Sequence, residues 1–168
     1  MSRIDYCNSL YINLPNYSLR KLQSVINRSA RLVCSLPPRI PTTGYLIDLH
    51  WLPIKTRIEF KICLLAFKAL KYGEPSYLTS LRTRRNTAQN MVLRTSDDPL
   101  RLLEPRAISE RHFSNRAFSY IAPRLLNRLP ASMKEIDSLD LFKSKLKSFL
   151  FARAYDLNDR SVNSEYRL

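Results

Sequence analysis

The chain has 168 residues, a length typical of one domain, and apolar residues make up 45% of it, which is enough to build a core. Its 28 lysines and arginines outnumber 14 aspartates and glutamates, so the net charge is +14, and this excess favours a polyanionic partner. Gly44 and Gly73 are the only glycines, which excludes nucleotide-binding loops built on clustered glycines.

The first predicted helix covers residues 19–33 and is amphipathic. We expect Ser18 to cap it and the prolines Pro37 and Pro38 to end it. At about 100° per residue, seven apolar side chains share one arc: Leu19, Leu22, Val25, Ile26, Ala30, Leu32 and Val33. The opposite arc is basic and has no acidic residue to neutralise it: Arg20, Lys21, Arg28 and Arg31.

A short helix within residues 42–51 and a long helix follow. The long helix begins at Pro53, because proline suits the first helical position, and ends before Gly73. Its wide apolar arc predicts the central core helix, with three of its members at the centre: Ile58, Ile62 and Leu65. One basic strip runs along it: Arg57, Lys61, Lys68 and Lys71.

The second half of the chain predicts an exposed loop at 83–91, a short β-hairpin within 92–103, and a helix over 114–126 that is either continuous or interrupted at Pro123. On that helix, Arg116 and Arg124 flank Tyr120 at four-residue spacing, an arrangement suited to phosphate pairing and base stacking, although Tyr120 could equally lie at the edge of the core. The last helix follows a Ser138 cap and carries Asp140 in its first turn.

The predicted fold class is therefore mainly α: a small helical bundle, with one short β-hairpin as an additional element. We expect residues 1–155 to form a single helical domain and residues 156–168 to form a flexible tail.

We find no catalytic constellation in the sequence. The acidic pair Asp97 and Asp98 precedes a proline in an apparent turn, and His50 and His112 lack a nucleophile or ligand at suitable spacing. We therefore expect no catalytic residues, no metal and no cofactor.

Three cysteines without a C-x-x-C pair are expected to be reduced and buried: Cys7, Cys34 and Cys63.

Localisation is predicted from the lack of two signals. The sequence has no run of about 18 apolar residues and no visible signal peptide. We therefore expect no membrane association and an intracellular location, in the nucleus or the cytoplasm.

Five segments in chain order carry a resemblance to a known family: 2–10, 22–33, 49–61, 116–130 and 142–147. They resemble the region after the palm in reverse transcriptases of jockey-like, non-LTR retrotransposons. The resemblance implies a helical thumb and the segment that follows it, which contact template and primer. In that family the catalytic aspartates and the endonuclease lie upstream of this region.

The resemblance implies a non-catalytic, C-terminal remnant of an RNA-directed DNA polymerase. Its expected partners are RNA, an RNA–DNA duplex or DNA, bound without sequence preference, together with the missing palm and fingers portions of the parent polymerase. The residues expected to bind nucleic acid are Arg20, Lys21, Arg28, Arg31, Arg57, Lys61, Lys68, Arg116, Tyr120 and Arg124.

Two other interpretations remain open at this point. One is a helical interaction module whose basic surface binds an acidic protein. The other is a fragment without selected function, whose apolar residues around 10–14 once faced the rest of the polymerase.

Overall fold

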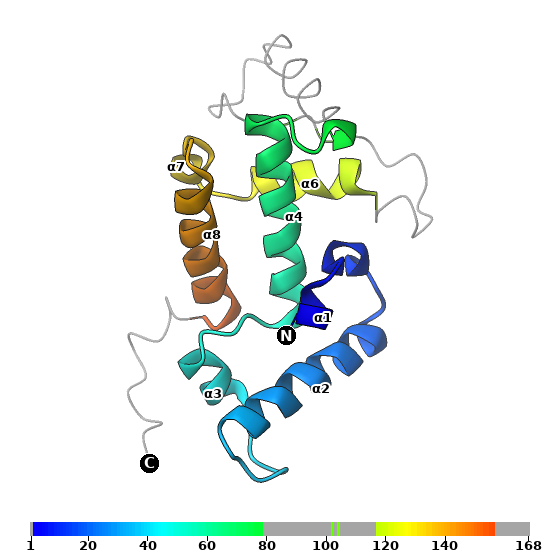
Figure 1. Cartoon of the computed structure of the whole chain (residues 1–168), viewed down its shortest axis with the longest axis vertical. Coiled ribbons are helices and arrows are strands. Elements are labelled where there is room, and N and C mark those ends of the chain that lie inside the picture. The colour runs from blue at the N-terminus through cyan, green and yellow to red at the C-terminus, as the bar shows by residue number, and fades with distance from the viewer. Residues whose placement is uncertain (1, 79–101, 103, 105–116, 157–168) are drawn as a thin grey trace. The chain divides into compact units, whose positions relative to one another are not determined.

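The computed structural model describes residues 2–78, 102, 104 and 117–156, and these residues are mainly helical, as predicted (Figure 1). They contain no strand, and the predicted hairpin at 92–103 lies outside them except for Leu102. Of the predicted tail, Asp156 alone is described. The helices are α1 (Ser2–Asp5), the 3-10 helix η1 (Asn8–Tyr11), α2 (Asn16–Val33), α3 (Thr43–Asp48), α4 (Ile54–Lys71), the 3-10 helix η2 (Ser76–Leu78), α6 (Phe118–Asn127), α7 (Ala131–Lys134) and α8 (Leu139–Ala154).

The chain divides into two compact units. One unit comprises residues 1–58 and 146–168, and the other comprises residues 59–145. The boundaries fall inside α4 and α8, so each of these helices contributes residues to both units. The single domain expected over 1–155 stays a prediction.

In the first unit, α2 begins earlier than predicted. Pro15 occupies the N-cap position with φ −53° and ψ 144°, and its carbonyl accepts the N–H of Ser18 at 3.0 Å. The prediction of Ser18 as the cap is therefore wrong, because the preceding proline already sets the extended backbone from which a helix starts. The helix ends at Val33, before the two prolines. There Ser35 adopts a left-handed φ of 53°, and the N–H of Leu36 closes back onto the carbonyl of Arg31 at 2.9 Å.

The apolar arc predicted for this helix is only partly covered. Three members are buried and three are exposed: Leu19, Ile26 and Ala30 inside, and Val25, Leu32 and Val33 outside. The exposed fractions of Val25, Leu32 and Val33 are 46%, 83% and 59%. At about 100° per residue, Val25 and Leu32 fall on the same side of α2 as the exposed cations, so the prediction that they belong to the apolar arc was wrong. The buried side of α2 is therefore narrower than the predicted arc.

The long helix α4 agrees with the prediction within one residue at its start, and its end at Lys71 is followed by Gly73 with φ 71°. Ile58 and Ile62 are each 1% exposed, which confirms them as core residues, whereas Leu65 is half-buried. In the second unit, Phe67 of α4 stacks on Phe142 of α8 with ring centroids 4.0 Å apart. A cavity of about 40 Å³ adjoins the two rings.

The helix α6 runs through Pro123 without interruption, which is one of the two forms that the sequence allowed. Pro123 is fully buried, so its packing offsets the loss of one helical hydrogen bond. The predicted start of this helix at Ser114 lies outside the described residues, and the described helix begins at Phe118.

The last helix, α8, follows Ser138, whose carbonyl accepts the N–H of Phe142 at 3.0 Å, and Asp140 lies in its first turn as predicted.

The cysteines differ in their environments. Cys63 is buried, Cys34 is half-buried and Cys7 is exposed, and all three are free thiols. The prediction of three buried thiols is therefore correct for Cys63 and wrong for Cys7. Cys7 has a left-handed φ of 49° at the start of η1, a turn that directs its side chain to solvent.

Candidate nucleic-acid interface

The basic residues of α2 fall into two environments. Arg20, Lys21 and Arg28 are exposed, and the sequence of α2 contains no acidic residue to pair with them. Arg31 is half-buried, and its Nη2 donates to the carbonyl of Ile40 at 3.2 Å. Its Nε is buried and has no hydrogen-bond partner within the described part of the chain. Three cations of α2 therefore face solvent, while the fourth is held against the loop that follows the helix.

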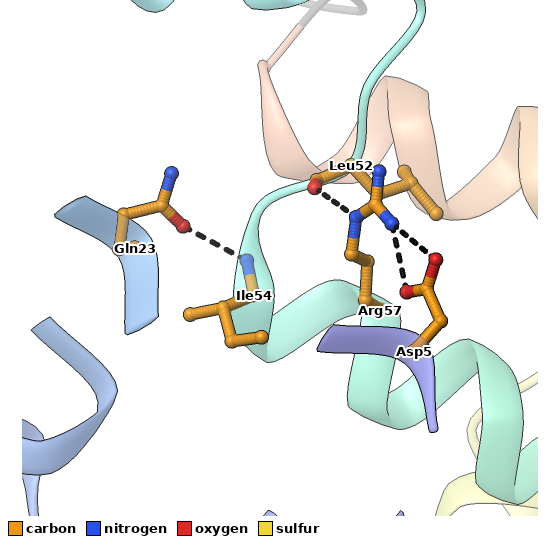
Figure 2. Close-up of polar contacts among 5 residues, drawn as sticks. All are labelled: Asp5, Gln23, Leu52, Ile54 and Arg57. Carbon is orange, nitrogen blue, oxygen red and sulfur yellow. Dashed lines mark hydrogen bonds and ion pairs between the residues drawn. The ribbon is translucent and has the colours of Figure 1, made fainter. Parts of the chain in front are cut away.

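Arg57 is directed into the protein rather than toward solvent. Its Nε donates to the carbonyl of Leu52 at 2.9 Å, and its Nη1 donates to both carboxylate oxygens of Asp5 at 2.8 and 2.9 Å (Figure 2). The side chain of Arg57 is 14% exposed and that of Asp5 is 45% exposed. Arg57 thus joins α1 to the start of α4 through its Nη1, while its Nε donates to Leu52.

Three side chains hold the connector between α3 and α4. Besides the Arg57 contact at Leu52, the Oε1 of Gln23 accepts the N–H of Ile54 at 2.9 Å, as Figure 2 shows. The hydroxyl of Tyr155 donates to the carbonyl of Trp51 at 2.6 Å. Because Leu52 and Ile54 are buried, these bonds satisfy buried backbone groups where the connector joins α4.

His50 has a structural role in the turn that follows α3. Its φ of 53° is left-handed, and the N–H groups of His50 and Trp51 close back onto the carbonyls of Ile47 and Leu46 at 2.9 and 2.8 Å. The imidazole stacks on Phe151 with centroids 5.5 Å apart. His112 and the pair at 97–98 lie outside the described residues.

The phenol of Tyr155 titrates abnormally. Burial raises its pKa to about 12, and the positive charge of Arg57 opposes part of that rise. The unfolded chain, with a tyrosine pKa of about 10, therefore loses this proton first as the pH rises. The stability that this difference provides is complete below pH ~10 and is lost as the pH rises toward ~12.

We expect the free energy of unfolding to be roughly 1 kcal/mol lower at pH ~11 than at pH ~9 because of Tyr155 alone. Urea unfolding at the two pH values measures this difference. Tyr155→Phe is the control: it loses the hydrogen bond to Trp51, but its stability should change less between the two pH values. Equal losses in both proteins would assign the effect to other groups.

The predicted basic strip of α4 continues into the second unit, where its lysines are half-buried or paired with an acidic residue. Lys61 and Lys68 are half-buried. Lys71 forms an ion pair with Asp137, whose backbone carbonyl also accepts the hydroxyl of Tyr72 at 3.0 Å. This arrangement fixes the end of α4 against the residues that precede α8.

Tyr120 and Arg124 of α6 lie side by side, as their spacing predicts. The guanidinium carbon of Arg124 lies 5.3 Å from the ring centroid of Tyr120, and its Nη1 donates to the hydroxyl at 3.2 Å. Glu104 approaches the Nε of Arg124 at 3.8 Å, so part of the positive charge is neutralised. Arg116 lies outside the described residues.

Asn127 has a role that the sequence analysis missed. Its Oδ1 accepts the N–H of Leu102 at 2.9 Å, its Nδ2 donates to the carbonyl of Leu102 at 3.0 Å, and the same Nδ2 donates to Glu104 at 2.9 Å. One side-chain amide therefore pairs with the backbone of a residue that is 3% exposed. The signal in the sequence was an asparagine at the end of a helix whose neighbouring residues are mostly apolar.

Among the described residues, no group of three or more histidine, cysteine, aspartate or glutamate side chains could hold a metal ion. Nor does any helix in this part of the chain have the length and apolar character needed to cross a membrane.

No family model, curated protein or solved structure matches this chain. The resemblance to non-LTR reverse transcriptases therefore stays a prediction from the five segments. The contacts of Figure 2 are made by side chains from three of those segments: Asp5, Gln23 and Arg57. These segments contribute to holding the fold as well as to the charge of the surface.

Proposed function

We propose that this chain binds nucleic acid through exposed basic helix faces, without sequence preference, as a non-catalytic part of a protein related to non-LTR reverse transcriptases. The observation that carries the proposal is the exposure of Arg20, Lys21 and Arg28 on α2, a helix without acidic residues, in a chain of net charge +14. Cations arranged in this way favour phosphate groups, and phosphate contacts position a nucleic acid without reading its sequence.

A second observation supports the same ligand class. On α6, the guanidinium of Arg124 lies over the ring of Tyr120, an aromatic side chain that is half-buried rather than enclosed in the core. An aromatic side chain outside the core can stack on a base, whereas Arg124 already contacts Tyr120 and Glu104 and contributes positive charge beside the ring. The proposed ligands are RNA, an RNA–DNA duplex or DNA, and the proposed location is the nucleus or the cytoplasm.

The proposed contact set is narrower than the one predicted from the sequence. Arg57 donates to Asp5 and Leu52, and Arg31 donates to Ile40, so both guanidinium groups are partly engaged within the protein and are left out of the proposed contact set. Arg20, Lys21 and Arg28 form the part of the predicted set that has the required exposure on α2.

We expect Arg20→Gln, Lys21→Gln and Arg28→Gln each to weaken binding to an RNA–DNA duplex about equally for unrelated sequences. Each lost phosphate contact should reduce the salt slope of the binding constant by about one unit. Fluorescence anisotropy over a series of salt concentrations measures both quantities, and circular dichroism on the same variants shows whether they remain folded.

Lys55→Gln is the matched control, because Lys55 is an exposed cation on α4 outside the proposed contact set. It should leave the salt slope unchanged. The proposal fails if the triple variant of Arg20, Lys21 and Arg28 stays folded and binds the duplex with the affinity and salt slope of the parent protein.

A further inference from the structure

The solvent side of α2 carries apolar residues that a nucleic-acid contact does not explain. Leu32 is 83% exposed and Val25 is 46% exposed, although both were expected in the core. Tyr17, in the first turn of the same helix, is 66% exposed. A phosphate backbone offers no apolar surface on which such side chains could be buried.

These apolar residues alternate with cations along one line. Lys21, Val25, Arg28 and Leu32 follow one another at intervals of four, three and four residues, and we call this row the outer seam. The mean spacing of about 3.7 residues is close to the 3.6 residues of one helical turn, so the row stays on one side of α2 and can contact a second helix along its length. The outer seam therefore presents basic and apolar positions alternately to a second helix.

The charge of the outer seam selects the kind of helix that can occupy it. A second copy of α2 would place cation against cation, because the helix has no acidic residue in either orientation. A helix with glutamates facing Lys21 and Arg28, and leucines facing Val25 and Leu32, would pair both charges and bury both apolar side chains.

We propose that the outer seam of α2 is a docking surface for an acidic amphipathic helix of a protein partner. Lys21 and Arg28 belong both to this surface and to the proposed nucleic-acid contact, so the two ligands exclude each other. Arg20 lies outside the outer seam and belongs to the nucleic-acid contact alone, whereas Leu32 belongs to the docking surface alone. These two residues separate the two functions experimentally.

The probe is a synthetic helical peptide, as long as α2, with glutamate and leucine alternating at the same intervals of four, three and four residues. We expect it to bind the full chain and to displace a bound RNA–DNA duplex in a fluorescence anisotropy experiment. Leu32→Ser should weaken peptide binding about tenfold and leave duplex binding unchanged. Arg20→Gln should weaken duplex binding and leave peptide binding unchanged.

Two controls test the specificity of the docking surface. Leu141→Ser removes a leucine that is 48% exposed on α8, and it should not change peptide binding. A peptide of the same composition in scrambled order should bind at least tenfold more weakly, because its charges and apolar groups no longer match the seam. The proposal is overturned if Leu32→Ser binds the ordered peptide as tightly as the parent chain, if both peptides bind equally, or if anionic lipid vesicles, and not the peptide, depend on Leu32.

Discussion

Replacing Phe142 by alanine is expected to lower the free energy of unfolding by about 3–5 kcal/mol. The side chain is 1% exposed, and its ring is nearly parallel to that of Phe67, with an interplanar angle of 12°. Truncation removes this stacking and the dispersion contacts of a whole ring. Because Phe142 also lines the cavity of about 40 Å³, the missing ring would enlarge an existing void. Thermal or urea unfolding followed by circular dichroism measures the loss.

Leu141→Ala is the matched control for this variant. Leu141 is the preceding residue of the same helix and is 48% exposed, so its truncation should cost less than about 1 kcal/mol. Any change in helix propensity is then similar in the two variants. A loss below roughly 1 kcal/mol for Phe142→Ala would contradict the packing of this ring on Phe67.

The helices were predictable because their signals are local. The boundaries of α4 and α8 follow from a proline, a glycine and a serine next to strongly periodic apolar positions. The start of α2 was misjudged because a serine is the better cap in general, whereas Pro15 had already fixed the backbone there. The exposure of Leu32 was misjudged because, at about 100° per residue, this side chain falls beside Arg28 rather than beside the buried Leu19.

The sequence predicts the positive charge of the candidate interface, but it does not predict which cations are paired with other residues of the protein. The sequence identifies Arg57 as a cation on a helix, but its partner Asp5 lies 52 positions earlier, and no local pattern links the two. Asn127 and Leu102 are similarly separated by 25 positions. Whether a cation faces solvent or a carboxylate is decided by tertiary packing. A helical wheel therefore overestimates the number of cations available to an external ligand.

Replacing Arg57 by leucine is expected to lower the free energy of unfolding by about 3 kcal/mol. The change removes one charge-assisted hydrogen bond to the carbonyl of Leu52 and a two-oxygen contact with Asp5, and bonds of this kind contribute about 1.5–3 kcal/mol each. Solvation of Asp5, which is 45% exposed, offsets part of the loss. Leucine retains apolar bulk in place of the arginine stem, so the measured loss reports mainly the polar contacts.

Lys55→Leu, at an exposed position of the same helix, is the control and should change stability by less than about 0.5 kcal/mol. A double-mutant cycle with Asp5→Ala isolates the coupling between Asp5 and Arg57, which we expect to be about 1 kcal/mol or more. Duplex binding by folded Arg57→Leu should keep the salt slope of the parent chain, because this guanidinium faces Asp5 rather than phosphate. If instead stability is unchanged and the salt slope falls by about one unit, Arg57 is a phosphate ligand and its contact with Asp5 does not persist in solution.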